Sequence, residues 1–355
     1  MKRREFLKMG AVGLTAAAFT STRIPNLFRE EEAQAATLNV SLNVAEVLVE
    51  MVDLTQVFMW AFADVNGPHI PGPVISANEG DTINITITNT TALPHQFSIP
   101  RVVTSGVINA GQVANVSFQA PPAGTYIYLD PLNAPVNRMM GLHGVLVVMP
   151  AAGNSPYSAP TPQVQALFND LGVSVEFPGS PWVPARTFIW VFNQIDPFLN
   201  NFMINNPPIN PSTFMRAFLP RYFTINGKSG YFASHDPTIA PHGRVGEPAL
   251  IRNVNVGLAT HSPHIHGNHV YVLSDNGRVL NNVFLVDTWS MRPEDRKDVL
   301  LPFIRPPDIP AAAWPPVQER FPLMYPMHCH MEMSQTSGGG NYPQGLVTDW
   351  VIDGP

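Results

Sequence analysis

Apolar and polar residues alternate strictly in several short segments of the first half of the chain. The clearest case is "GDTINITITNT", in which Ile83, Ile85 and Ile87 alternate with polar neighbours. Alternation with a period of two is typical of a β-strand that has one buried face. Further short apolar segments lie at residues 114–120, 124–129 and 144–150, separated by glycine and proline. The first half therefore predicts a set of short strands joined by turns.

The second half of the chain repeats this organisation. Its apolar segments lie at residues 186–195, 222–227, 247–257, 269–274 and 345–352. The stretch "GEPALIRNVN" is similar to "NEGDTINITITN" of the first half, so the two halves look like copies of one unit. Many short strands at this spacing predict an all-β protein with two Greek-key β-sandwich domains. We place the domains at residues 36–150 and 185–355, joined by a Pro-, Ser- and Gly-rich linker at 151–184 with room for one short helix.

The composition narrows the class of protein. Charged residues make up 13% of the 355 positions and the net charge is −6, so no basic stripe indicates nucleic-acid binding. The 37 prolines favour strands and turns over long helices. No apolar run is long enough to predict a transmembrane segment in the mature chain.

The first 35 residues resemble a twin-arginine export signal of a bacterium. Arg3 and Arg4 precede a modest apolar stretch, and the small residues Ala33 and Ala35 mark a cleavage site. A membrane-anchoring helix, the alternative, needs a longer apolar run. We therefore predict export to the periplasm or the cell exterior. Because an exported protein with one cysteine forms no internal disulfide, Cys329 is buried, reactive or a metal ligand.

Six of the eleven histidines fall in two short segments, "HSPHIHGNH" and "HCH". Alternate residues of a strand share a face, so His264 and His266 point to one metal region. His328 and His330 likewise share a face, and Cys329 points to the opposite one. Cysteine and histidine together suit copper or zinc. The alternative is a set of core histidines whose hydrogen bonds are satisfied.

These two segments resemble the C-terminal copper motifs of the multicopper oxidase family, which includes laccases, bilirubin oxidases and copper-resistance oxidases. The resemblance covers residues 40–355 and implies cupredoxin-like domains. By position, it implies His261 and Cys329 as type 1 copper ligands, His264 as a type 2 ligand, and His266, His328 and His330 as type 3 ligands.

The second domain departs from the family pattern at two positions. Ser334 stands where the family has the second type 1 histidine, and Gly339 where it has the axial Met or Leu. The stretch "TSGGGNYPQGL" is an expected detour that brings Leu346 back to the site. Because a serine hydroxyl is a poor ligand beside a soft thiolate, we expect the thiolate copper to be weak, altered or absent.

The first domain keeps one matching histidine, His95, which the resemblance implies as a type 2 ligand. The family's other histidine positions there fall on Phe97, Leu129 and Pro131. We expect His95 to approach the four C-terminal histidines and help bind a single copper or zinc ion with an open position. Candidates for an extra oxygen ligand, a proton relay or an approach to the metal are Asp130, His143 and Glu332, each with an ordinary structural role as the alternative.

Three functions remain open at this level. The first is an exported, copper-binding, multicopper-oxidase-like protein, acting as an oxidoreductase with a reduced metal site. The others are a non-catalytic metal-binding or electron-transfer protein and a copper-free cupredoxin scaffold. We favour the first, because the retained histidines argue against a scaffold and Ser334 argues against pure electron transfer. The expected partners are a small-molecule or metal-ion reductant and dioxygen, and a homo-oligomer stays open because two-domain relatives often trimerise.

Overall fold

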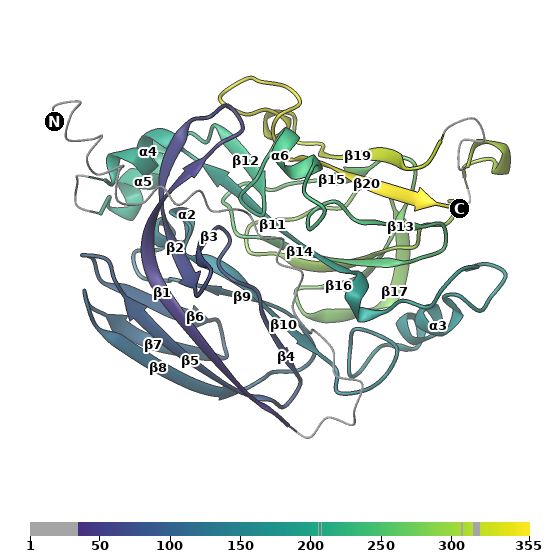
Figure 1. Cartoon of the computed structure of the whole chain (residues 1–355), viewed down its shortest axis with the longest axis horizontal. Helices are drawn as coiled ribbons and strands as arrows, with labels where there is room; N and C mark the ends of the chain where they lie inside the picture. The colour runs from purple at the N-terminus through teal and green to yellow at the C-terminus, as the bar shows by residue number, and fades with distance from the viewer. Residues whose placement is uncertain (1–34, 205, 207, 307, 315–319) are drawn as a thin grey trace.

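The computed structural model describes residues 35–355 except 205, 207, 307 and 315–319, so the predicted export signal lies outside the described residues apart from Ala35. Strands dominate this part of the chain and form two β-sandwiches, one drawn in purple to blue and one in green to yellow in Figure 1. The predicted all-β fold with two cupredoxin-like sandwiches is confirmed.

The first sandwich consists of two five-stranded sheets. One sheet has the order β3 (Gly67–His69), β2 (Gln56–Asp64), β1 (Thr37–Glu50), β5 (Thr82–Asn89) and β8 (Val113–Gln119). The other has the order β4 (Ile75–Asn78), β10 (His143–Met149), β9 (Gly124–Leu129), β6 (His95–Ile99) and β7 (Val103–Ile108). The alternating isoleucines of β5 are buried between these sheets, as the period of two predicts.

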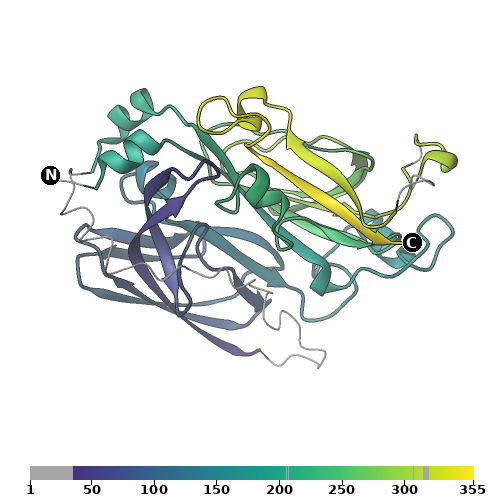
Figure 2. The same ribbon diagram turned by 45° about the horizontal axis from the view of Figure 1, so that its top comes forward.

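The second sandwich has sheets of six and four strands. The larger sheet has the order β12 (Tyr222–Ile225), β11 (Thr187–Ile195), β14 (Ala249–Asn255), β18 (Arg296–Leu301), β16 (Val270–Asp275) and β17 (Arg278–Val286). The smaller has the order β13 (His242–Arg244), β20 (Val347–Gly354), β19 (Leu323–Cys329) and β15 (Pro263–Ile265). Figure 2 shows β19 and β20 in yellow across the top of this sandwich. The parallel pair of β11 and β14 corresponds to that of β1 and β5, which supports the internal repeat.

The helices in the described part of the chain are short. The α-helices are α2 (Val136–Met139), α3 (Pro162–Asp170), α4 (Pro197–Phe202), α5 (Pro211–Ala217) and α6 (Gly230–Ser234). The 3-10 turns are η1 (Pro184–Arg186), η2 (Ala311–Ala313) and η3 (Glu332–Gln335). No helix of this part is both long and apolar enough to cross a membrane.

The segment between the two sandwiches packs as part of the core. Val164, Leu167 and Phe168 of α3 are buried in a cluster that also contains residues of both sandwiches. Their spacing of three and four residues places them on one face of the helix. The helix of the segment that reads as a linker by composition therefore packs against the second sandwich, beside β17.

A buried ionic network joins the sandwiches across this cluster. The Arg252 guanidinium donates to the Asp298 carboxylate at 3.1 Å and to the Thr125 hydroxyl at 3.0 Å. The same carboxylate accepts from the Thr125 hydroxyl and from the Tyr157 hydroxyl, each at 2.9 Å. First domain, connecting segment and second domain thus share one hydrogen-bonded network with little access to water.

Candidate metal centre

Strand pairing brings the histidines of the two motifs together. β15 pairs antiparallel with β19, and His264 lies directly opposite His328 in this register. The chain continues past β19, and the main-chain N–H of His330 donates to the carbonyl of Ser262 at 2.8 Å. This bond keeps His330 beside β15, so three imidazoles meet on one face of the sheet.

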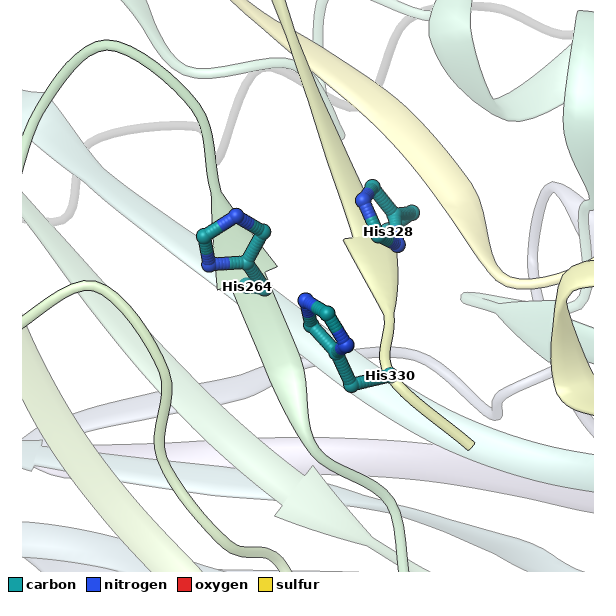
Figure 3. A group of neighbouring side chains, drawn as sticks. All are labelled: His264, His328 and His330. Carbon is teal, nitrogen blue, oxygen red and sulfur yellow. The ribbon is translucent and has the colours of Figure 1, made fainter. Parts of the chain in front are cut away.

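Figure 3 shows His264 on β15, His328 on β19 and His330 just beyond the end of β19. One nitrogen from each ring lies within 4.8 Å of the other two. The ring centroid of His264 is 4.7 Å from that of His330 and 5.4 Å from that of His328. This is the group of three potential metal ligands found among the described residues.

His266 lies against the same group. Its Nε2 is 2.9 Å from Nε2 of His328, so these two nitrogens face each other. The orientation of His264 is fixed from behind, because its Nδ1 lies 2.9 Å from the Thr288 hydroxyl and 3.2 Å from the carbonyl of Asp287. Nε2 of His264 is therefore the nitrogen left to bind a metal.

The surroundings of these rings favour the neutral imidazole. Partial burial lowers the pKa of His264, and neighbouring histidines lower it further, while the nearby Asp287 opposes them. Burial also lowers the pKa of His266, with the same help from its histidine neighbours. Since only the neutral ring binds a metal, the cluster favours the form of histidine that a metal requires.

Cys329 points to the interior of the sandwich, away from this group. Its thiol is buried, and Sγ lies 3.6 Å from Nδ1 of the buried His261. An ion bound at about 2.3 Å from sulfur and 2.0 Å from nitrogen would hold these atoms roughly 3.5–3.7 Å apart. The Nδ1–Sγ separation thus fits either a bridging ion or a weak N–H···S contact.

Burial raises the pKa of the Cys329 thiol, and hydrogen bonds from Ser334 and the N–H groups of Ser262 and Met331 partly offset it. Burial lowers the pKa of His261 to about 4, so this ring is neutral at pH 7. The buried pair is therefore a thiol beside a neutral imidazole.

The loop after the "HCH" motif returns as expected. The N–H of Cys329 donates to the carbonyl of Leu346 at 3.1 Å, and the N–H of Leu346 donates to the carbonyl of Ser334 at 2.7 Å. Leu346 and Ser334 are both buried beside the thiol. Gly339 lies instead against the guanidinium of Arg221, away from the axial position that the motif implies.

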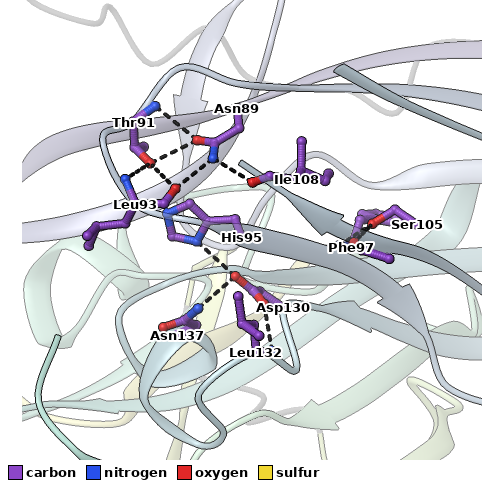
Figure 4. A network of polar contacts seen from close by, with 11 residues as sticks. Asn89, Thr91, Leu93, His95, Phe97, Ser105, Ile108, Asp130, Leu132 and Asn137 are labelled. Carbon is purple, nitrogen blue, oxygen red and sulfur yellow. Dashed lines mark hydrogen bonds and ion pairs between the residues drawn. The ribbon is translucent and has the colours of Figure 1, made fainter. Parts of the chain in front are cut away.

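The structure places His95 apart from the histidine group, in the interior of the first sandwich. Its Nδ1 lies 2.8 Å from the Asp130 carboxylate, and its ring packs edge-on against Trp60 at a centroid distance of 5.1 Å. The amide of Asn137 donates to the same carboxylate at 2.8 Å, as Figure 4 shows. Within the described residues His95 is not among the metal-capable cluster, so the expected approach from the first domain is not seen.

Internal symmetry explains the position of His95. In each domain a buried asparagine, Asn89 or Asn255, donates to two main-chain carbonyls, the first of them four residues later. His95 and His261 each follow their asparagine by six residues. His95 is therefore the counterpart of His261, whereas the motif matched it to a residue of the other face.

Main-chain hydrogen bonds likewise identify Asp130 as the counterpart of Cys329. The N–H of Asp130 donates to the carbonyl of Leu142 at 3.0 Å, as that of Cys329 does to Leu346. The N–H of Leu142 in turn donates to the carbonyl of Asn137 at 3.1 Å, the bond that Leu346 makes with Ser334. We call His95, Asp130 and Asn137 the first triad, and His261, Cys329 and Ser334 the second triad.

The remaining candidates lie outside the histidine group. His143 is buried on β10, and its Nδ1–H donates to the carbonyl of Arg138 at 2.9 Å. Burial lowers the pKa of His143 to about 4. Glu332 is exposed on η3 and lines an open surface hollow with Arg221.

Sequence reasoning missed Gln194, whose amide contacts Nε2 of His261. Its signal in the sequence is a glutamine in the mostly apolar stretch "FIWVFNQI", where the neighbouring Asn193 is the other polar residue. Asn137 was not predicted either, because the family motif has no ligand at its position.

Comparisons with known proteins agree with this architecture. The family model described as multicopper oxidase matches residues 55–153. The crystal structure of the blue copper oxidase from Nitrosomonas europaea aligns with a TM-score of 0.66 at 22% identity, over 88% of this chain and 85% of that one. The chain has the fold of the multicopper oxidase-like cupredoxin family.

Curated relatives of this cupredoxin protein carry copper enzyme names. It is 23% identical to Laccase-12 of Oryza sativa subsp. japonica over 67% of this chain and 39% of the laccase. It is also 23% identical to the copper-containing nitrite reductase of Rhizobium sullae over 60% of this chain and 54% of the reductase. The matched region thus spans well under two thirds of either relative.

Proposed function

We propose that the protein is an exported copper oxidoreductase with a reduced metal set, in which His264, His328 and His330 hold the reactive ion. The observation that carries the proposal is the convergence of one nitrogen from each ring to within 4.8 Å of the others. Relatives named laccase and copper-containing nitrite reductase support copper-dependent redox chemistry.

The donor set fits copper. Imidazole nitrogens suit copper and zinc, and metal–nitrogen bonds of 2.0–2.1 Å place tetrahedral ligands about 3.3 Å apart. The observed limit of 4.8 Å requires only small ring rotations, and His330, the exposed member of the three, has the most room to make them. His266 lies close enough to His328 to join as a fourth nitrogen donor.

Each residue has a defined part in this site. Thr288 and the carbonyl of Asp287 hold His264 so that its Nε2 faces the other rings. His330 is exposed, which leaves one side of the group open to a small molecule. Copper bound here would supply one-electron chemistry.

Further parts of the proposal rest on the sequence. They are export through the signal at residues 1–35 to the periplasm or cell exterior, a small-molecule or metal-ion reductant, and dioxygen as oxidant. Assembly into a homo-oligomer remains a prediction.

Metal quantitation tests the site. Protein purified after export is freed of metal, loaded separately with Cu(II) and Zn(II), and analysed for ions per chain and by electron paramagnetic resonance. We expect His264→Ala combined with His328→Ala to abolish binding of the ion. His235→Ala, which removes an exposed histidine outside the group, is the matched control. Unchanged metal content in the double variant would contradict the proposed site.

Oxidation of a phenolic dye separates the oxidoreductase from its alternative. We expect slow turnover in the copper-loaded protein, none in the zinc-loaded protein and none in the double variant. Copper bound by these histidines without any turnover would instead support a non-catalytic metal-binding protein.

A further inference from the structure

We infer that Gln194 holds His261 in the tautomer whose proton lies on Nδ1, facing Cys329, and thereby opposes copper binding by this pair. Gln194 is thus a positioning residue of the second triad. The inference concerns the buried face of β19 and stands whether or not the group of His264, His328 and His330 on the other face binds an ion.

The orientation of the Gln194 amide follows from its neighbours. Its side-chain oxygen accepts from the main-chain N–H of Leu258 at 2.6 Å and from that of Ala259 at 3.0 Å. A main-chain N–H can only donate, so the atom between these two groups must be the oxygen. The NH₂ group of the amide is therefore the part that contacts Nε2 of His261.

Packing keeps the amide in this orientation. Gln194 is fully buried on β11, and a Cβ placed on Gly257 would overlap its amide group. Gly257 thus provides the space that Gln194 fills. Turning the amide over would place its NH₂ against two N–H donors, leaving all of them without an acceptor.

The tautomer of His261 then has one solution. A neutral imidazole has one N–H and one bare nitrogen. Nε2 receives a hydrogen from Gln194, so Nε2 is bare and Nδ1 carries the proton. Nδ1 lies 3.6 Å from Sγ of Cys329, which makes the proton a link between the imidazole and the sulfur.

The first triad reaches the same tautomer by a different route. Nδ1 of His95 lies 2.8 Å from the Asp130 carboxylate, which can only accept, so the proton of His95 is also on Nδ1. In the first domain the residue opposite Nδ1 fixes the proton. In the second domain Gln194 fixes it from the far side of the ring.

Copper binding conflicts with this arrangement. An ion between His261 and Cys329 must take the lone pair of Nδ1, which moves the ring proton to Nε2. That proton then faces the NH₂ of Gln194, and two buried donors oppose each other. Leaving a buried donor unpaired corresponds to about tenfold to a hundredfold weaker copper binding.

Replacing the amide of Gln194 by a carboxylate tests whether its NH₂ group opposes copper binding. Gln194→Glu keeps the shape, accepts from Leu258 and Ala259, and offers a second acceptor to Nε2–H of His261. The variant is compared with Gln194 protein in a background that carries His264→Ala and His328→Ala, so that the exposed group contributes nothing. Copper is titrated without oxygen, and the thiolate-to-copper absorption is recorded. We expect affinity to rise tenfold to a hundredfold and the absorption to appear.

Two further measurements complete the test. Gln112→Glu makes the same charge change at an exposed position and should leave copper affinity unchanged. Long-range ¹H–¹⁵N spectra of histidine-labelled wild-type protein report the tautomer directly, with His261→Gln to assign the ring. We expect the proton on Nδ1 of His261. A proton on Nε2 overturns the inference, even if Gln194→Glu fails to fold, and so does equal copper affinity in the folded variant.

Discussion

The two cupredoxin domains carry different chemistry at the same position of their fold. The first triad contains a carboxylate, Asp130, that accepts from His95, from Asn137 and from the N–H of Leu132, each at 2.8 Å. The second triad contains a thiol, Cys329, whose contacts with N–H donors are longer, at 3.2–3.6 Å. The carboxylate of Asp130 is fully engaged in short hydrogen bonds, whereas Cys329 keeps a soft sulfur atom that only weak contacts hold.

This difference shows that the residue at the position of Asp130 and Cys329 has a structural role separate from metal binding. In both domains it ties a strand end to the short helical turn that follows, α2 or η3. The first domain fills this role with a charged hydrogen-bonded network, which needs no metal. The second domain keeps two of the three side chains that would build a thiolate copper site. We infer that the hydrogen bond from Gln194 favours a proton on Nδ1 of His261, where that copper would bind.

The largest expected effect comes from breaking the first triad. Asp130→Ala leaves two buried donors, on His95 and Asn137, and the partly buried N–H of Leu132 without their acceptor, so we expect the free energy of unfolding to fall by about 3–5 kcal/mol. Cys329→Ala at the matching position should cost only about 1 kcal/mol. Urea unfolding of the metal-free protein measures both.

Asp170→Ala, which removes an exposed carboxylate, serves as the control and should change stability by less than about 0.5 kcal/mol. Equal losses for the Asp130 and Cys329 variants would show that the two triads do the same structural work.

An intermediate effect comes from pH. His143 in the first domain and His261 in the second have folded-state pKa values of about 4, lowered by burial. Their unfolded value is about 6.5. Between pH 6.5 and 4 the unfolded chain binds a proton that the folded chain rejects, so stability is complete above pH 6.5 and falls as the pH decreases. We expect each ring to remove about 2 kcal/mol between pH 6.5 and 5.

Unfolding by urea at pH 7, 6 and 5 measures this loss. His143→Gln retains a donor for the carbonyl of Arg138. It should reduce the loss of stability at low pH by the contribution of one imidazole. His261→Gln should reduce it by a similar share. A pH dependence that both variants leave intact would place the responsible groups elsewhere.

The smallest effect separates two explanations for a weak thiolate site. Ser334→His supplies the missing imidazole but leaves Gln194 in place, so we expect copper affinity of the buried pair to rise by no more than about tenfold. Adding Gln194→Glu should increase the affinity further and give strong visible absorption. Intense absorption from Ser334→His alone would show that the lost imidazole, and not the tautomer, limits the site.

Much of the fold could be predicted from local pattern. The alternation in "GDTINITITNT" and its echo "GEPALIRNVN" form matching buried strands, β5 and β14, because one period of two places one set of side chains in the core. The connecting segment was harder to predict, because its proline and glycine content hides the apolar stripe of α3. That stripe becomes informative only once the strands that it covers are known.

The part of the candidate site that was predictable consists of residues that are close in sequence and lie on one strand. For His264, His266, His328 and His330, spacing placed each pair on one strand face, and the family resemblance indicated that the two motifs meet. The position of His95 was not predictable from spacing, because it takes the hydrogen bonds of Asn89 and Asn255 in the folded domains to align it with His261. Gln194 acts from a strand 67 residues away from His261, a distance that no local motif spans.

The buried network of Arg252, Asp298, Thr125 and Tyr157 has a consequence for cooperativity. Separating the domains would break the hydrogen bonds that Thr125 of the first domain makes with Arg252 and Asp298 of the second, and would expose the apolar cluster to which both sandwiches contribute. The two sandwiches should therefore melt in a single transition, although each has its own core. Damage to the first triad would then lower the melting temperature of the second sandwich as well, although none of its own residues has changed.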